Sequence, residues 1–472
     1  MSLPAPAKKV IIIGGGIAGI KAAIDLQKKS VDYLIFEAKG RLGGRLNTVT
    51  GFHGKYDLGA SWFHETLNNP LFDEEMSLGN PIDDPKIFYD DGPKKIFNKD
   101  GIVSPFLKLD SIVNELFKYV DICNEEDLDS DKPYYENVIN YLRSRKHLLT
   151  DEQITNVSQY ARSLELWHGI DSQMLSSKYA SIDNEGRDAL CLNYDRVLKR
   201  HTDQLDQEKV FLNTPVTGVS RIEKGSKVEI ELKDGKKLVA DAVIVAVPQS
   251  ILQLSAGEDG YIEFSPKLPA KITDSLQSIH FGALGKVILE FEDIFWPTDF
   301  ERASILSDPP EGFLRAIKDN KDVPEFTRNK SSHGHPQTWD FPAFVLNYAG
   351  CFQKPSLVIL TQQPLTNYLE SNKDIAWKHC KPMIQVLSGK TDVPDPINVI
   401  VTNWTQDVYQ RGAYSACYPG DDPLMPILAL EEGFGNVRFA GEHTVLEGAG
   451  CVHGAWSSGK REAEALIERF GL

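Results

Sequence analysis

The chain contains little cysteine and no long apolar run. Its 472 residues include six cysteines, which are scattered without a CxxC pair or a spacing typical of metal ligands, so neither disulfides nor a metal site is expected. No segment approaches the roughly 18 consecutive apolar residues of a membrane-spanning helix, and we expect no signal peptide. These absences predict a cytoplasmic protein that does not bind membranes.

Positive charge is also scarce. The formal net charge is -16, from 51 Lys and Arg residues against 67 Asp and Glu residues. This balance disfavours binding to nucleic acid and favours cationic partners, although many acidic proteins gain only solubility from such a surface. The length and the ordinary apolar content of 41% predict two domains built on more than one core.

A glycine motif stands between a predicted strand and a predicted helix near the N-terminus. The strand covers residues 10–13, the glycines are Gly14, Gly16 and Gly19, and the helix covers residues 20–29. Glycines at this spacing allow a tight turn, a close approach of backbone to a pyrophosphate and close packing of helix on strand. The N-terminus of the helix then presents free N–H groups to the phosphates.

An acidic residue follows the next predicted strand. This strand covers residues 33–36 and ends directly before Glu37, which lies 18 residues beyond Gly19. An acid in this place can accept hydrogen bonds from the ribose of a dinucleotide. The alternative is an ordinary glycine turn, but the order of strand, glycines, helix, strand and acid favours a Rossmann-type βαβ unit.

The rest of the chain changes character along its length. Helical patterns cover residues 104–123 and 133–145. Three short segments are predicted strands: 227–232, 237–239 and 242–247. Residues 308–340 are polar and rich in proline, which predicts a surface excursion or a mobile loop.

Four further stretches carry a resemblance to a known family. RLGGR at residues 41–45 and DLGASW at residues 57–62 resemble the second glycine motif and the flavin-ring segment of the monoamine oxidase superfamily of FAD-dependent amine oxidases. RFAGEHT at residues 438–444 and GAGCVHGAW at residues 448–456 resemble the C-terminal flavin motif of that family, and a helix is predicted from near Ser457.

The resemblance implies a noncovalently bound FAD and an α/β fold. In that fold a discontinuous Rossmann-type FAD-binding domain carries an inserted mixed α+β substrate-binding domain. We expect the FAD-binding domain at residues 1–85, 200–265 and 405–472, and the substrate-binding domain at residues 86–199 and 266–404.

The same resemblance implies which residues contact FAD. Arg45 is expected near the pyrophosphate, with a solvated loop charge as the alternative, and Glu442 is expected near the ribityl chain. The expected contacts are Gly14, Gly16, Ala18, Gly19, Glu37, Arg45, Gly59, Ala60, Ser61, Trp62, Val216, Gly441, Glu442, Cys451 and Val452.

Within this superfamily the chain resembles the polyamine oxidases of yeast, which oxidise spermine, more closely than it resembles distant amine oxidases. WFH at 62–64, LELWHG at 164–169, FGALGK at 281–286 and RGAYSAC at 411–417 carry this resemblance. It implies that the protein converts spermine to spermidine, 3-aminopropanal and hydrogen peroxide by hydride transfer to flavin N5, with oxygen as the acceptor. The alternatives are an N-acetylpolyamine oxidase, another amine oxidase, or a noncatalytic flavin-bearing scaffold. The oligomeric state is left open.

Three residues are predicted to be catalytic on the strength of this resemblance. Lys286 lies in an alternating strand and would hold a water against flavin N5; the alternative is a solvated lysine or a pair with Glu290. His64 would place an amine nitrogen of the substrate; the alternative is a core histidine. Tyr414 would form an aromatic wall before the flavin; the alternative is a buried strand tyrosine.

Other residues are predicted substrate contacts. Trp62 and Leu284 are expected in the substrate tunnel, and Trp167 either lines it or fills a core gap. Cys451 stands where related enzymes supply a second aromatic wall. Asp188 replaces an asparagine of the yeast enzymes, so its carboxylate is expected to pair with a distal ammonium or to change the preferred amine.

Two neighbouring acids, Asp90 and Asp91, are further candidates at the mouth of the tunnel. The alternative for this pair is a solvated turn.

Overall fold

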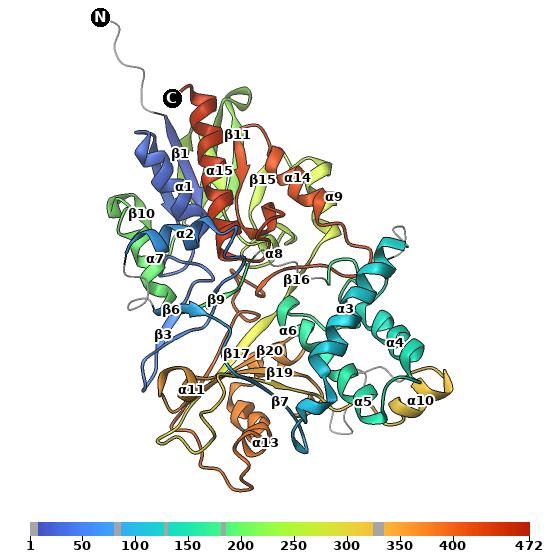
Figure 1. Ribbon diagram of the computed structural model, residues 1–472. Coiled ribbons are helices and arrows are strands. Elements are labelled where there is room, and N and C mark those ends of the chain that lie inside the picture. The colour runs from blue at the N-terminus through green and yellow to red at the C-terminus, as the bar shows by residue number, and fades with distance from the viewer. Residues whose placement is uncertain (1–7, 80–85, 127–130, 181–185, 324–334) are drawn as a thin grey trace, which may run out of the picture.

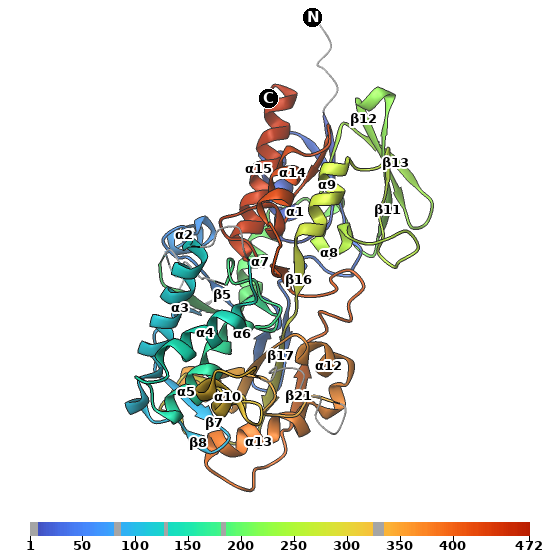
Figure 2. The same cartoon turned by 90° about the vertical axis from the view of Figure 1, so that its right-hand side faces the viewer.

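The computed structural model describes residues 8–79, 86–126, 131–180, 186–323 and 335–472. The elements form two lobes, one above the other in Figure 1. The upper lobe contains the first strand and the last helix, blue and red in Figure 1, while the lower lobe is built from the middle of the chain. Figure 2 shows the same two lobes from the side.

A five-stranded parallel sheet forms the centre of the upper lobe. Its order is β10 (Val210–Phe211), β2 (Asp32–Phe36), β1 (Lys9–Ile13), β14 (Ala242–Val245) and β23 (Val437–Phe439). All neighbouring strands are parallel. The strands come from both ends and from the middle of the chain, so this lobe is discontinuous in sequence.

Both faces of this parallel sheet are covered. The helices α1 (Ile17–Lys28) and α15 (Val452–Phe470) pack on one face. The other face packs against a four-stranded sheet in the order β13 (Lys237–Ala240), β12 (Lys227–Leu232), β11 (Val216–Ile222) and β15 (Glu263–Ser265). Val10 and Ile12 of β1 point to the helices and Ile11 and Ile13 to the second sheet, which explains the continuous apolar run of this strand.

A seven-stranded sheet forms the centre of the lower lobe. Its order is β21 (Asn398–Val401), β17 (Leu284–Glu290), β20 (Ser356–Gln362), β19 (Ala343–Asn347), β18 (Arg302–Ile305), β7 (Lys94–Asn98) and β8 (Gly101–Ile102). The helices α12 (Leu365–Ser371) and α13 (Ala376–Ser388) pack on one face. The opposite face points toward the upper lobe.

Strand β17, second from one edge of the seven-stranded sheet, divides its side chains as the alternating pattern predicts. Val287 and Leu289 lie in the core beneath α12 and α13, whereas Leu284 and Ile288 pack on the opposite face. Lys286 shares that opposite face. The strand therefore directs a lysine toward the region between the lobes.

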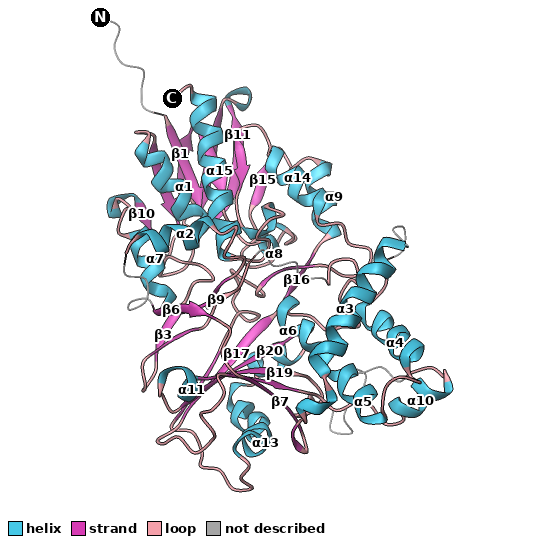
Figure 3. Cartoon of the chain, in the orientation of Figure 1, coloured by secondary structure: helices cyan, strands magenta, loops and turns pink. Residues whose placement is uncertain are grey.

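Helices form a third layer beside this sheet, cyan in Figure 3. They are η1 (Pro105–Leu107), α3 (Leu109–Glu126), α4 (Tyr134–Arg145), α5 (Asp151–Tyr160), η2 (Ala161–Leu164), α6 (Glu165–His168) and α10 (Phe313–Asp319). All of them except α6 contribute side chains to one apolar core, whereas Leu166 of α6 packs in the core on the opposite face of the sheet from α12 and α13. Within the described residues, no helix is long and apolar enough to cross a membrane.

Three small sheets lie between the two main sheets. They are β3 (Thr48–Thr50) with β4 (Lys55–Asp57), β5 (Trp62–Phe63) with β9 (Ala189–Leu192) and β6 (Lys86–Tyr89), and β16 (His280–Gly282) with β22 (Tyr414–Ala416). The remaining helices are α2 (Pro70–Ser77), α7 (Tyr194–Thr202), η3 (Gln207–Lys209), η4 (Glu223–Gly225), α8 (Gln249–Leu252), α9 (Ala270–Ser275), η5 (Leu276–Ser278), α11 (Tyr348–Phe352), η6 (Lys373–Ile375), α14 (Leu424–Glu432) and η7 (Glu442–Thr444).

Two predictions of secondary structure need correction. The last helix begins at Val452, five residues before the predicted start near Ser457. Gly454 lies in its first turn, where a Cβ would stand 2.1 Å from the Gly448 carbonyl oxygen, so this glycine permits residues 448–450 to pass close to the helix. The predicted excursion at 308–340 contains the packed helix α10, and its residues 324–334 lie outside the described residues.

The predicted division into two domains stays a prediction. Its boundary at residues 85 and 86 touches residues outside the described ranges. Two strand pairs and one helix cross the predicted boundaries: β5 pairs with β9, β16 pairs with β22, and α7 spans residue 200. These crossings hold the two lobes together at the level of the small sheets.

Candidate active site

A large cavity connects the two lobes. Its volume is about 650 Å³, and its lining runs from Ile13 and Phe36 at the ends of parallel strands to Lys286, Ser304 and Phe344 of the seven-stranded sheet. The carboxyl ends of strands in an open parallel sheet are the usual place for a ligand. The cavity therefore joins a nucleotide-binding position to the centre of the lower lobe.

The glycine turn forms the upper end of this cavity. Gly14 has a φ of +105°, and a Cβ there would stand 2.5 Å from the Ala246 carbonyl oxygen, so the turn requires glycine. A Cβ on Gly16 would meet nothing within 4 Å. Because α1 begins directly after Gly16 without a side-chain cap, the N–H groups of its first turn remain available to an anion.

Glu37 closes the side of the glycine turn. Its carboxylate accepts hydrogen bonds from the backbone N–H groups of Gly15 at 2.7 Å and Lys39 at 2.8 Å. Burial raises the pKa of Glu37, and these hydrogen bonds oppose the shift. The side chain lines the cavity where the ribose of a dinucleotide is predicted.

Arg45 is bound to a second carboxylate of the cavity. Its Nη1 donates to Glu442 Oε1 and to the Ala413 carbonyl oxygen, each at 2.8 Å. Glu442 also accepts from the Ser415 hydroxyl at 2.7 Å and from the Gly450 N–H at 3.0 Å. Burial opposes its ionisation, but the charges of Arg45 and His443 and the hydrogen bonds from Arg45 and Ser415 together outweigh burial and lower the pKa of Glu442. Arg45 is therefore paired inside the protein and is not a solvated loop charge.

Lys286 lies at the lower end of the DLGASW segment. Its Nζ donates to the carbonyl oxygens of Asp57 at 2.8 Å and Gly59 at 2.6 Å, and to the Ser61 hydroxyl at 2.6 Å. These three acceptors use all three hydrogens of an ammonium group. The alternative of a pair between Lys286 and Glu290 is wrong, because Glu290 accepts from the backbone N–H groups of residues 52 and 53.

Two buried groups with shifted pKa values meet here. Burial lowers the pKa of Lys286 to about 8, and the charge of Asp57 opposes the shift. Burial raises the pKa of Asp57 to about 6, opposed by the Thr48 hydroxyl and by Lys286. Titratable groups shifted toward neutral pH inside a cavity are typical of catalytic sites.

Aromatic rings shape the lower part of the cavity. Trp62 lies with its ring 5.8 Å from the Nζ of Lys286. Tyr414 donates its hydroxyl to the Trp167 carbonyl oxygen at 2.5 Å, and Trp167, which is 44% exposed, lines the cavity. The tryptophan therefore faces open space rather than filling a core gap.

His64 is held by Asp188. The imidazole Nδ1 lies 3.0 Å from Asp188 Oδ2, and the ring stands between Trp62 and Trp167 at centroid distances of 6.4 and 5.6 Å. His64 lines the cavity, but Asp188 does not. The carboxylate thus contacts the histidine from behind, which differs from the predicted direct contact with substrate.

The two acids of the predicted tunnel mouth lie in different surroundings. Asp90 lines the cavity, pairs with Arg302 at 2.9 Å and accepts from the Trp62 indole at 3.1 Å. Asp91 is not among the lining residues, and its carboxylate pairs with Arg187 at 2.5 Å at the surface. Only the first of these acids therefore lies where a ligand in the cavity could reach it.

Nearly all the predicted site residues come together around this cavity. The predicted residues that line it are Gly14, Gly16, Ala18, Glu37, Arg45, Gly59, Ala60, Ser61, Trp62, His64, Trp167, Val216, Leu284, Lys286, Tyr414, Gly441, Glu442, Cys451 and Val452. Gly19 does not line it, because this glycine packs against the Gly14 carbonyl oxygen instead. Its part is to bring α1 close to the glycine turn.

Sequence reasoning missed several residues of the site. Glu65 and Arg302 line the cavity, and Asp57 and His453 stand directly behind it. Asp57 and Glu65 are neighbours of predicted residues, which is the one sequence signal available for them. In the described part of the chain, no group of His, Cys, Asp and Glu side chains is arranged to hold a metal ion.

Comparison with known proteins assigns the family. A family profile described as flavin containing amine oxidoreductase matches residues 17–467. The chain belongs to this family. It is 38% identical to a corticosteroid-binding protein of Candida albicans over 98% of this chain and 96% of that protein. It is 30% identical to polyamine oxidase 2 of Arabidopsis thaliana over 98% of this chain and 89% of that protein.

A third similarity is more distant. The chain is 26% identical to the lysine-specific histone demethylase 1 homolog 1 of Arabidopsis thaliana, over 97% of this chain and 52% of that protein. Membership of the family makes this protein an FAD-dependent amine oxidoreductase with a Rossmann-type FAD-binding fold and a substrate domain.

The upper part of the cavity fits FAD. Gly16 leaves open space beside the first turn of α1, where a pyrophosphate can approach backbone N–H groups. Cys451 and Val452 bring the N-terminus of α15 to the same cavity. Two helix N-termini on one cavity suit a ligand with negative charge at its centre and polar oxygens at its ring.

Proposed function

We propose that this protein is an FAD-dependent polyamine oxidase whose substrate is spermine. The reaction consumes spermine, oxygen and water and forms spermidine, 3-aminopropanal and hydrogen peroxide. The observation that carries this proposal is the continuous cavity, which joins the glycine turn to a section lined by aromatic rings and carboxylates. An extended amine with several ammonium groups complements such a section, because rings attract cations and carboxylates pair with them.

The chain offers an ordered set of contacts for the cofactor. Gly16 and the first turn of α1 would bind the pyrophosphate, Glu37 and Val216 the adenosine, and the segment at 59–62 the flavin. When bound, FAD accepts two electrons from the carbon beside an amine nitrogen and passes them to oxygen. Arg45 and Glu442 would close the site around the ribityl chain, since they tie β22 to the glycine turn at 448–450.

The state of Cys451 supports noncovalent binding of FAD. Burial raises the pKa of its thiol, and the charges of Glu65 and Glu442 add to the shift. The thiolate is the nucleophilic form of cysteine. A thiol that stays protonated is a weak nucleophile toward the flavin.

Lys286 is proposed to hold a water molecule against flavin N5. A pKa of about 8 gives the side chain a substantial neutral population near neutral pH. The neutral amine keeps two hydrogens for the carbonyl oxygens of Asp57 and Gly59 and gains one lone pair. A water molecule or the Ser61 hydroxyl can donate to that lone pair.

His64 is proposed to bind an amine nitrogen of the substrate. Its Nδ1 is occupied by Asp188, so Nε2 remains for the ligand. The carboxylate then fixes the plane of the imidazole and does not itself bind the ammonium. Trp62, Trp167, Leu284 and Tyr414 would form the walls along which the carbon chain lies.

Analysis of the products tests this proposal. Aerobic incubation with spermine is expected to yield spermidine, 3-aminopropanal and hydrogen peroxide in equal amounts, measured by chromatography and a peroxide assay. Oxidation of N1-acetylspermine without oxidation of spermine would change the assignment to an N-acetylpolyamine oxidase. Oxidation of neither amine would remove the polyamine assignment.

A neutral corticosteroid is a second candidate ligand for the same cavity. The 38% identity with a protein of that name motivates it, and apolar side chains such as Leu166, Ile305, Phe344 and Leu360 line the lower part of the cavity. Competition distinguishes the two ligands. If a corticosteroid binds and excludes spermine, this second candidate is supported. If it does not bind, the corticosteroid candidate is rejected.

A further inference from the structure

The carboxylates that line the cavity differ in how they are neutralised. Glu442 pairs with Arg45 and Asp90 pairs with Arg302, while Glu37 accepts two backbone N–H groups. Glu65 also lines the cavity, with a side chain 22% exposed. In the described part of the chain, the group that contacts its carboxylate is the imidazole of His453, at 3.0 Å from Oε2 to Nε2.

The hydrogen bonds of Asn69 decide the protonation of His453. The Asn69 Oδ1 accepts from the Phe72 N–H at 2.9 Å and so caps α2. Its Nδ2 must therefore face the other way, where it lies 2.7 Å from the His64 carbonyl oxygen and 3.2 Å from His453 Nδ1. An amide N–H donates, so Nδ1 accepts.

This arrangement makes His453 a neutral donor. An imidazole whose Nδ1 accepts carries its single hydrogen on Nε2, and this hydrogen points to Glu65 Oε2. A doubly protonated ring would direct a second N–H at Asn69 Nδ2, which is itself a donor. Glu65 thus gains a hydrogen bond from His453 but no positive charge.

The backbone of Glu65 is held in an unusual conformation. Its φ is +56°, in the left-handed region that is strained for a residue with a side chain. The Asn68 N–H donates to the Glu65 carbonyl oxygen at 2.8 Å and closes the turn. The turn and His453 together direct the carboxylate into the cavity beside Cys451. Burial, followed by the charge of Glu65, raises the pKa of the Cys451 thiol.

We propose that Glu65 binds an ammonium group of the substrate other than the nitrogen that is oxidised. Among the described residues, it is the lining carboxylate that has neither a cation nor a pair of backbone donors beside it, so a bound ammonium completes its pairing. The inference rests on the proposed function for the identity of the substrate. It makes Glu65, together with His64 beside it, a determinant of selectivity for amines that carry more than one charge.

The test compares two ligands that differ by one ammonium, octane-1,8-diamine and octylamine. Their dissociation constants are measured by calorimetry on the FAD-loaded protein without oxygen. In Glu65→Gln the amide oxygen can still accept from His453, but the charge is gone. The diamine is expected to bind about 10- to 100-fold more weakly, because a hydrogen bond to a charged group contributes about 1.5–3 kcal/mol. Octylamine is expected to bind as before.

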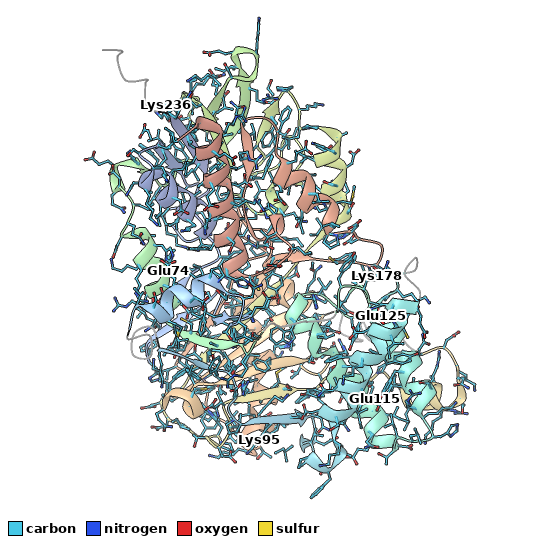
Figure 4. All side chains as sticks on the ribbon, turned by 45° about the horizontal axis from the view of Figure 1, so that its top comes forward. Glu74, Lys95, Glu115, Glu125, Lys178 and Lys236 are labelled. Carbon is cyan, nitrogen blue, oxygen red and sulfur yellow. The ribbon has the colours of Figure 1, made fainter. Side chains whose placement is uncertain are left out.

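Two further variants complete the test. Glu115→Gln removes the same charge from an exposed residue of α3, labelled in Figure 4, and is expected to leave both constants unchanged. Glu65→Asp keeps the charge and is expected to recover part of the affinity for the diamine. Its FAD content, measured from the visible spectrum, reports whether the turn has folded.

The outcomes separate this inference from the proposed function. Equal affinity for the diamine in wild type and Glu65→Gln overturns the role of Glu65, even if spermine is oxidised. If Glu65→Gln selectively lowers the affinity for the diamine but the wild type oxidises no amine, the ammonium site is supported and the proposed oxidase function is rejected.

Discussion

Lys286 is a buried cation whose surroundings suit both of its protonation states. As an ammonium it donates to the Asp57 and Gly59 carbonyl oxygens and to the Ser61 hydroxyl. As a neutral amine it keeps the two carbonyl oxygens and accepts from a hydroxyl or a water. The side chain can therefore change its charge without leaving a buried group unpaired.

Lys286→Met tests this residue in the reaction. The variant is expected to keep its FAD, because Lys286 contacts the backbone of the cofactor-binding segment rather than the predicted phosphate site. Reduction by amine is expected to slow by about 100-fold, the size of a typical proton-transfer contribution. Stopped-flow spectroscopy measures the rate, with Lys236→Met at an exposed turn, labelled in Figure 4, as the matched control. Unchanged rates with both amine and oxygen would remove Lys286 from the mechanism.

The shifted pKa of Lys286 also predicts how stability depends on pH. The folded protein loses this proton near pH 8, whereas the unfolded chain holds it to an ordinary value of 10.5. Between these values the unfolded state binds more protons, so stability rises with pH. Below pH 8 the penalty of burying the charge is fully present, on the order of 3 kcal/mol.

Melting temperatures measure this effect. On raising the pH from about 7.5 to about 10, the melting temperature of the wild type is expected to rise relative to that of Lys286→Met. The comparison cancels the other lysines, which both proteins share. A difference that is the same at both pH values would mean that Lys286 has an ordinary pKa in the folded protein.

The contact between His64 and Asp188 predicts that the two residues act as a unit. His64→Ala and Asp188→Ala are each expected to lower kcat/KM for spermine by about tenfold, the value of one charge-assisted hydrogen bond. The kcat/KM of the double variant is expected to equal that of the less active single variant, because the second substitution removes no further interaction. Independent effects that multiply would show that Asp188 acts on the substrate directly.

At the scale of elements, two glycines test two different parts of the upper lobe. A Cβ on Gly459 of α15 would stand 2.1 Å from the Ala18 carbonyl oxygen of α1, whereas a Cβ on Gly16 would meet nothing within 4 Å. Gly16 also has a φ of -74°, which alanine adopts freely. One glycine therefore serves the packing of two helices, and the other leaves room for a ligand.

Alanine at each position should separate these roles. Gly459→Ala is expected to lower the melting temperature of the FAD-free protein, since overpacking costs about 1–3 kcal/mol. Gly16→Ala should leave that temperature unchanged and weaken FAD binding by about tenfold or more. Titration of the FAD-free protein with FAD measures the affinity. Normal affinity in Gly16→Ala would place the pyrophosphate elsewhere.

The sequence predicts the elements that have a local signature. The βαβ unit and the alternation of β17 follow from periodicity and glycine spacing, and both are present. The start of α15 at Val452 differs from the predicted start near Ser457, and Gly454 in its first turn is placed by a close contact with Gly448. Local sequence patterns do not predict such contacts, which form only when one segment of the chain packs against another.

The contacts of site residues were less predictable for the same reason. The motif positions identify Lys286 and His64, but their partners depend on the packing of separate strands. Asp188 meets His64 across the β5–β9 pair, and Arg302 reaches Asp90 from another sheet. Which carboxylate faces the cavity and which stands behind it is therefore a property of the fold.

At the scale of the whole molecule, the net charge and the carboxylates of the cavity both favour cationic ligands. The protein carries a formal charge of -16, and the cavity between the lobes is lined by several carboxylates. The long-range field of an acidic protein raises the encounter rate of a cationic ligand, and salt screens it. A polyamine with several charges gains more from this field than an amine with one.

Salt dependence tests this effect. On raising the salt concentration from about 20 to about 200 mM, kcat/KM for spermine is expected to fall severalfold. Binding of octylamine, with one charge, should change much less over the same range. If both respond equally, the overall charge has no part in selecting the substrate.

The most direct measurement is the reduction of the flavin by substrate. The purified yellow protein is mixed without oxygen with spermine, N1-acetylspermine and spermidine in turn, and the visible absorbance of the flavin is followed. An FAD-dependent spermine oxidase is expected to lose this absorbance fastest with spermine and to regain it when oxygen is admitted. Absorbance that stays constant with all three amines would contradict the assignment to polyamine oxidation.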